Sequence, residues 1–259
     1  MKKKILLQIL STIILLACWD IITRNFNIRE AVFPGPIAVI SKLYPLLTEE
    51  ELLKHFSVTL FECLLGFTCG FYLAVSFAII VTHSKLFELL SEPPIVLLQS
   101  IPKIAIAPTV VSVFGLAMGP KIFLATLLSF FPVFISLVYG LKYVSPALLD
   151  IMKIYGANKR ETLIWARVPN SLPTLFYGIK IALLASIVGV IIGEFWGAEA
   201  GGMGYLIIYS QAKPDTPAVF AELLFLGFMG RGFICLTRFI EKKVVYWLKE
   251  QGQEGGFLW

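Results

Sequence analysis

Charged residues are scarce in this sequence: they make up 15% of its 259 residues, whereas 58% are hydrophobic. Soluble domains carry about 25% charged residues, so an ordinary soluble fold is excluded. Long uncharged runs occur instead, at residues 63–84, 104–120 and 122–141. A membrane span needs roughly 20 mainly apolar residues to cross about 30 Å of hydrocarbon. We therefore expect an all-α, polytopic protein embedded in a lipid membrane.

The groups that usually carry out catalysis are almost missing. There are two histidines, His55 and His83, and neither belongs to a cluster with metal-ligand spacing. The sequence has no GxSxG motif, and no GxxxxGK motif followed by Ser or Thr, so we do not expect the chain to hydrolyse a nucleotide by that route. The four cysteines lie in apolar stretches without metal or redox spacing. We expect no enzyme activity, no cofactor, no metal and no nucleic-acid partner.

The apolar stretches predict six spans, at about residues 5–22, 56–82, 88–117, 120–143, 174–197 and 218–240. The third contains four prolines, which predicts a kinked, broken or re-entrant course. The sixth is the weakest, because Glu222 and Arg231 interrupt it.

The lysines and arginines predict the orientation of these spans. If the N-terminus lies inside, thirteen of the 22 basic residues fall in inner segments and five in outer segments. Basic residues gather on the cytoplasmic side of membranes. We therefore expect both termini, and the connection at 142–173, in the cytoplasm.

The segment at about 145–173 is more polar than its surroundings and carries its own helix signals. Ser145 and the proline after it are typical of a helix start, and Gly156 of a left-handed helix end. Asn158, with Glu161 three residues later, predicts a second start of the capping-box type. A short helix, a glycine turn and another short helix between two spans would form a docking element.

Acidic residues inside the apolar segments allow two interpretations. In the first, Glu194 has a functional role: it lines a pathway or holds a gate closed through an ion pair. In the second, its carboxylate lies near the membrane edge and simply reaches water. For Glu62, Glu222 and Arg231, which are closer to predicted span ends, the water-exposed interpretation is favoured.

Small residues form a stripe in the fifth predicted span and a loop after it. Ala185, Gly189, Gly193 and Gly197 allow close helix approach, either within the chain or at a subunit interface or moving contact. The glycine-rich segment at 201–205, which includes Gly204, permits tight turns near a pathway mouth.

The polar segment resembles the EAA motif of bacterial ABC-importer permeases, which reads EAA, three residues, Gly, nine residues and Ile-x-Leu-Pro. Here Asp150 begins a triplet that departs from the EAA text, Gly156 is the glycine and Pro169 ends the motif with the spacing kept. The triplet Gly156-Ala157-Asn158 resembles the family's Gly-Ala-Ser, and Pro169 with Pro173 resembles its closing Pro-x-x-x-Pro.

Further motifs extend the resemblance, in order, over nearly the whole chain and to the nitrate, sulfonate, taurine and bicarbonate branch. They are Phe33-Pro34-Gly35-Pro36, Thr59-Leu60, Gly66-Phe67, Ile101-Pro102, Ala107-Pro108, Phe114-Gly115, Phe131-Pro132, Gly193-Glu194 and residues 202–207. Glu62 stands where sulfonate-type members often have arginine, which is more similar to relatives that import thiamine-precursor pyrimidines or riboflavin.

The resemblance implies one permease domain over residues 1–259, with the type I importer fold and a cytoplasmic coupling helix, in a bacterial inner membrane. A second copy, or a close relative, would complete the pathway for a small solute: a sulfonate, nitrate or taurine-like anion, a thiamine-precursor pyrimidine or riboflavin. An extracytoplasmic substrate-binding protein would deliver that solute, and cytoplasmic ATP-binding subunits would drive its transport. The residues implied to couple to the ATPase are Asp150, Tyr155, Gly156, Ala157, Asn158, Pro169 and Pro173, and the pathway or gate candidates are Glu194, Gly193, Gly189 and Gly204.

A stand-alone secondary transporter or channel is the alternative function. Buried ionisable side chains in several spans, or inverted repeats, would favour it.

Overall fold

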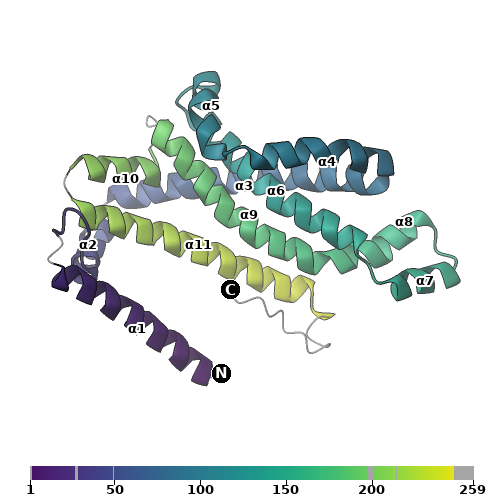
Figure 1. The fold of residues 1–259 in the computed structure, drawn as a ribbon, viewed down its shortest axis with the longest axis horizontal. Coiled ribbons are helices and arrows are strands. Elements are labelled where there is room, and N and C mark those ends of the chain that lie inside the picture. Colours follow the sequence, from purple (N-terminus) through teal and green to yellow (C-terminus); the bar gives the residue numbers. More distant parts are fainter. Residues whose placement is uncertain (1, 27–28, 49, 198–200, 214, 248–259) are drawn as a thin grey trace. The chain divides into compact units, whose positions relative to one another are not determined.

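The computed structural model describes residues 2–26, 29–48, 50–197, 201–213 and 215–247, and these form helices and connecting segments without a strand (Figure 1). The helices are α1 (Lys2–Asn25), α2 (Pro36–Thr48), α3 (Glu50–His83), α4 (Lys85–Ser100), η1 (Lys103–Ile106), α5 (Ala107–Phe114), α6 (Met118–Lys142), α7 (Pro146–Ile154), α8 (Lys159–Thr162), η2 (Leu163–Arg167), α9 (Val168–Trp196), α10 (Met203–Ala212) and α11 (Thr216–Val244).

Five helices are long and apolar enough to cross a membrane, and α4 together with η1 and α5 makes a sixth candidate. That sixth candidate bends by 81° at a short break, as its prolines predict. The break follows from Pro102, because the residue before a proline is driven out of the helical region. Ile101 has a ψ of 127°, and Pro102 itself is extended. The predicted all-α membrane fold with about six spans is confirmed.

The sixth predicted span forms one unbroken helix of 29 residues, α11, although Glu222 and Arg231 lie within it. Helix α2 was not predicted, because a segment of 13 residues is too short to register as a span.

The chain folds as two compact units, Met1–Thr59 with Gly201–Phe228 and Leu60–Ala200 with Met229–Trp259. In the first unit, Trp19 and Phe33 pack against Phe220, and the indole N–H of Trp19 donates to the Pro34 carbonyl at 3.1 Å. The expectation of a single permease domain stays a prediction.

The second unit is built on close contact of α6 with α9 and with α3. A Cβ atom added to Gly189 would lie 2.6 Å from the Cα atom of Ala125, and one added to Gly193 would lie 2.7 Å from the Cα atom of Lys121. On the other side of α6, a Cβ at Gly66 would lie 2.3 Å from the Cβ of Ala125. Such distances are far below van der Waals contact, so only glycine lets these backbones approach. Of the two interpretations of the stripe, the structure supports packing within the chain at Gly189 and Gly193.

Candidate functional site

The connection between α6 and α9 contains the predicted helix, glycine turn and second helix start. The side chain of Ser145 accepts a hydrogen bond from the Leu148 backbone at 3.3 Å, and Pro146 is the first residue of α7. This confirms the predicted helix start. Asp150 lies on α7, where it forms an exposed ion pair with Lys153 at 2.9 Å.

Helix α7 ends in the hydrogen-bond pattern of a Schellman motif. The Ala157 N–H donates to the Met152 carbonyl and the Gly156 N–H to the Lys153 carbonyl, both at 2.9 Å. Gly156 has a φ of +72°, a left-handed conformation, while no atom lies within 4 Å of the place where its Cβ would be. Glycine is therefore needed at this turn for its backbone conformation and not for space.

The second helix starts with a complete capping box. The Glu161 N–H donates to the Asn158 side chain at 2.9 Å, and the Asn158 N–H donates to the Glu161 carboxylate at 2.8 Å. These reciprocal bonds satisfy two of the otherwise unpaired N–H groups of a helix start. Both ends of the turn are thus fixed by local hydrogen bonds, as the sequence predicts.

The structure corrects the end of this element. Residues 159–196 form one continuous helical course of 38 residues, whereas a separate short helix was predicted before the fifth span. The π-helical turn η2 makes this possible: the Val168 N–H donates to the Leu163 carbonyl, five residues back. Pro169 is the second residue of α9, directly after this π-helical turn. Pro173 lies inside α9 without ending it.

Large apolar side chains are exposed on this element. Ile154, Tyr155 and Trp165 are 83%, 85% and 72% exposed. Large apolar side chains left exposed outside the membrane spans are candidates for an interaction surface. We refer to residues 145–173 as the coupling loop, after the role that the family resemblance implies for this segment.

The base of the coupling loop is tied to the end of α6. The Asn170 side chain donates to the Gly140 and Tyr143 carbonyls at 3.2 and 3.3 Å, and Arg167 donates to the Leu141 carbonyl at 3.2 Å. These are carbonyl groups that a helix end leaves unpaired. The loop is therefore held to two helices, α6 and α9.

A second candidate site is a buried charge cluster formed by Glu62 of α3, Lys121 of α6 and Glu194 of α9. None of the three side chains has any exposed surface within the chain. The Lys121 Nζ lies 3.1 Å from Oε1 of Glu62, and the Glu194 carboxyl interacts with that of Glu62. Burying a charge is costly unless it is paired, so Lys121 is the group that makes two buried carboxyls tolerable.

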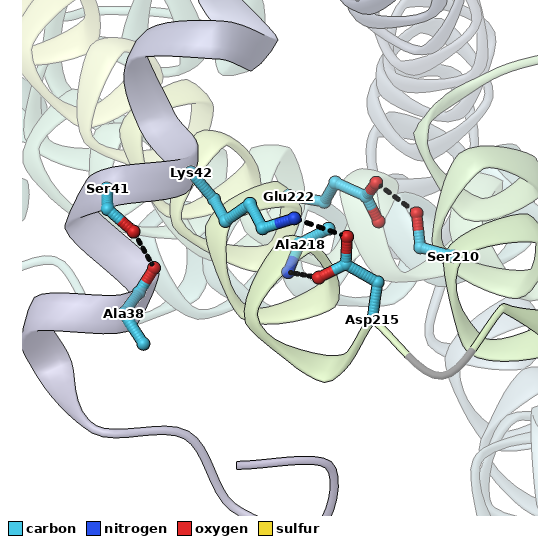
Figure 2. Close-up of polar contacts among 7 residues, drawn as sticks. All are labelled: Ala38, Ser41, Lys42, Ser210, Asp215, Ala218 and Glu222. Atoms are coloured by element: carbon cyan, nitrogen blue, oxygen red, sulfur yellow. Dashed lines mark hydrogen bonds and ion pairs between the residues drawn. The ribbon is translucent and has the colours of Figure 1, made fainter.

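The sequence had favoured water exposure for Glu62 and Glu222, and this was wrong. Both side chains are fully buried, and Oε1 of Glu222 accepts a hydrogen bond from Ser210 at 2.6 Å (Figure 2). Their partners, Lys121 and Ser210, lie on other helices, so no local pattern in the sequence predicts that these carboxyls are buried. Arg231 is exposed on the surface of α11, and its contact with water stays a prediction. The Glu194 carboxyl also does not reach water; its role as a pathway or gate residue stays a prediction.

The glycine-rich segment 201–204 leads into α10, where side chains of α3 meet the helix start. The Gly202 N–H donates to Nδ1 of His55 at 2.9 Å, and the Met203 N–H donates to the Thr59 hydroxyl at 2.8 Å. Gly204 is buried within the first turn of α10. These contacts make the segment an anchored helix start; a pathway mouth there stays a prediction.

Comparison with known proteins agrees with this architecture. Residues 66–246 match the family described as "Binding-protein-dependent transport system inner membrane component". A protein of Haemophilus influenzae named "Probable ABC transporter permease protein" is 34% identical, over 87% of this chain and 91% of its own length.

Two further relatives carry names that refer to different solutes. A Bacillus subtilis permease named for aliphatic sulfonates transport is 26% identical, over 90% of this chain and 84% of its own length. The "Formylaminopyrimidine transport permease protein ThiX" of Halalkalibacterium halodurans is 28% identical, over 92% of this chain and 94% of its own length. The chain thus belongs to the family of inner membrane components of binding-protein-dependent transport systems, the permeases of ABC importers.

Proposed function

We propose that this permease couples to cytoplasmic ATP-binding subunits through the coupling loop. The observation that carries the proposal is the loop's construction: a turn fixed by a Schellman motif and a capping box presents exposed Ile154, Tyr155 and Trp165. A preformed apolar surface loses little conformational freedom when a partner covers it. Asp150, Gly156, Ala157 and Asn158 shape this surface, and Pro169 and Pro173 lie where it joins α9.

The same loop would transmit the movement of those subunits into the membrane. Through Arg167 and Asn170 it is tied to α6, and through η2 it continues into α9. A displacement of the loop therefore moves both helices. Rigid-body movement of packed helices is the usual basis of alternating access.

The buried charge cluster would hold α3, α6 and α9 together during that movement. Its three charges belong to one helix each, and Gly193 lets the backbone of Lys121 approach α9. In this proposal Glu194 and Gly193 act on the pathway through helix position, as Gly189 does.

Orientation, partners and substrate complete the proposal. The distribution of basic residues supports cytoplasmic termini in a bacterial inner membrane. A second copy of the chain would complete the pathway, and an extracytoplasmic substrate-binding protein would deliver a small solute, such as a sulfonate, nitrate or taurine-like anion, a thiamine-precursor pyrimidine or riboflavin. The Glu62 carboxylate gives no preference for the charge of the solute, because it pairs with Lys121.

Buried ionisable side chains in several spans are also a feature of stand-alone transporters. In this chain Lys121 forms an ion pair with Glu62 within the cluster, and the family is that of ABC-importer permeases. The coupled importer is therefore the better account.

The test compares two substitutions of Gly156 in the permease co-expressed with its ATP-binding subunit. Gly156→Val forces a β-branched residue into a left-handed conformation, whereas Gly156→Asn keeps a residue that tolerates it. We expect Gly156→Val to lose most of the co-purified ATPase and of ATP-driven uptake in liposomes, and Gly156→Asn to retain both. Retention of both by Gly156→Val, or uptake by the permease alone without ATP, contradicts the proposal.

A further inference from the structure

Helix α2 is an apolar helix that connects two spans without being one. It has 13 residues, so at 1.5 Å per residue it is about 20 Å long, whereas the hydrocarbon core is about 30 Å thick. The preceding span ends at Asn25 and the following span begins at Glu51. No further span lies between them among the described residues, so α2 stays close to the membrane surface at which α1 ends and α3 begins.

One face of α2 is packed against its own unit. Val39 and Leu46 are buried on this face. Next to them, the Nζ of Lys42 forms an ion pair with the Asp215 carboxylate at 2.5 Å (Figure 2). This face is therefore already occupied.

A second face carries an uncovered apolar stripe of Ile37, Ile40, Tyr44 and Leu47. The spacing of three, four and three residues places them on one side of the helix. Their exposed fractions run from 50% for Leu47 to 75% for Tyr44. Left in water, four such side chains would lose the free energy that burial of apolar surface provides.

Two polar side chains, Ser41 and Thr48, border one edge of this stripe and need no partner. Ser41 and Thr48 are exposed, and their hydroxyls donate to the Ala38 and Pro45 carbonyls within the helix, at 2.7 and 2.8 Å. Figure 2 shows the contact of Ser41 with Ala38. An apolar stripe beside a polar one is the pattern of a helix that lies in a membrane interface.

We propose that α2 is an interfacial helix, lying along the bilayer surface with Ile37, Ile40, Tyr44 and Leu47 inserted among the lipids. The stripe carries no charge, and tyrosine is enriched at membrane interfaces. Exposed apolar side chains also lie on both neighbouring candidate spans, Ile21 in the last turns of α1 and Leu53 in the first turn of α3. This assignment does not depend on the proposed coupling to ATP-binding subunits.

The ion pair gives the interfacial helix a mechanical role. Asp215 also accepts a hydrogen bond from the Ala218 N–H at 3.4 Å, at the beginning of α11 (Figure 2). The Thr216 hydroxyl donates to the Ala31 carbonyl at 2.6 Å, just before α2. Through these contacts α2 holds the start of α11 at the depth of the membrane surface.

The test measures the surroundings of α2 in the full-length permease in lipid nanodiscs. Single cysteines replace Ile40, Tyr44 or Leu47, and the matched controls Ser41 or Thr48, after the four natural cysteines are changed to alanine. A nitroxide label then reports collisions with oxygen, which concentrates in lipid, and with a water-soluble nickel chelate. We expect the ratio of oxygen to nickel collisions to be several-fold higher at the three stripe positions than at the two controls.

Two other outcomes would overturn the proposal. A high nickel accessibility at the stripe means that it faces water, and low accessibility to both reagents means that another protein chain covers it. A benzophenone amino acid at Ile40, compared with one at Ser41, repeats the test with the natural cysteines retained. Adducts to lipid at Ile40 are expected, and adducts only to protein would contradict the proposal.

Discussion

The coupling loop and the buried charge cluster both depend on paired charges and hydrogen bonds, but they obtain them in opposite ways. At the turn of the loop, each partner lies three to five residues away along the chain, as between Asn158 and Glu161. In the cluster, Glu62, Lys121 and Glu194 come from three different helices. Loss of one contact in the loop should therefore affect only the backbone near it. Loss of one side chain from the cluster should lower the stability of the packing among all three helices.

The largest effect is expected from Lys121→Met, which leaves two buried carboxyls without a cation. Removing one partner of a buried ion pair costs about 3–5 kcal/mol, so the free energy of unfolding should fall by that order. The measurement is denaturant or thermal unfolding of the purified protein in detergent.

Lys153→Met is the matched control for Lys121→Met, because it breaks an ion pair of 2.9 Å in which both side chains are mostly exposed. Exposed pairs contribute little to stability. Equal destabilisation by the two substitutions would remove the distinction between cluster and loop. The double change Lys121→Met with Glu62→Gln should recover part of the loss, since fewer charges then stay unpaired.

A smaller effect is expected from Gly193→Ala at the contact between α9 and α6. The new Cβ would lie 2.7 Å from the Cα atom of Lys121, so the two helices must separate. Overpacking of this kind costs about 1–3 kcal/mol in unfolding measurements.

Gly232→Ala in α11 serves as the control, because no atom lies within 4 Å of its added Cβ. There the better helix propensity of alanine should leave stability unchanged or slightly raised. If Gly193→Ala is as stable as Gly232→Ala, the close approach of the α6 and α9 backbones does not contribute to the stability of the protein.

The smallest effect on global stability is expected from Asn158→Ala in the coupling loop. Loss of a helix cap costs about 1 kcal/mol, and here the loss is confined to the start of α8. Hydrogen exchange should become faster at the backbone amides of 160–162, with little change in thermal unfolding. Asn158→Ser, which can still cap the helix, should restore slow exchange; a large fall in the melting temperature of Asn158→Ala would show that the loop is not an independent unit.

Local signals explain what the sequence could predict. Ser145, Gly156 and the pair Asn158–Glu161 act on backbone groups within one or two turns, so their spacing alone specifies the caps and the turn. The break before Pro102 is local for the same reason.

Contacts between distant segments explain what the sequence did not predict. The partner of Glu62 depends on how α3 packs against α6, which no spacing in the sequence encodes. A separate short helix was predicted before the fifth span, but the π-helical hydrogen bond from Val168 to Leu163 depends on the register of the whole segment. Helix α2 was missed because its 13 residues are too few to register as a span.

The unbroken course from Lys159 to Trp196 gives the permease a lever arm. Its 38 residues measure about 57 Å at 1.5 Å per residue, nearly twice the thickness of the hydrocarbon core. A tilt of about 5° applied at the coupling loop would therefore sweep the far end through about 5 Å, close to one helical pitch. The hydrogen bond from Val168 to Leu163 joins η2 to α9, so the arm runs without a break from the coupling loop to Glu194 near its other end.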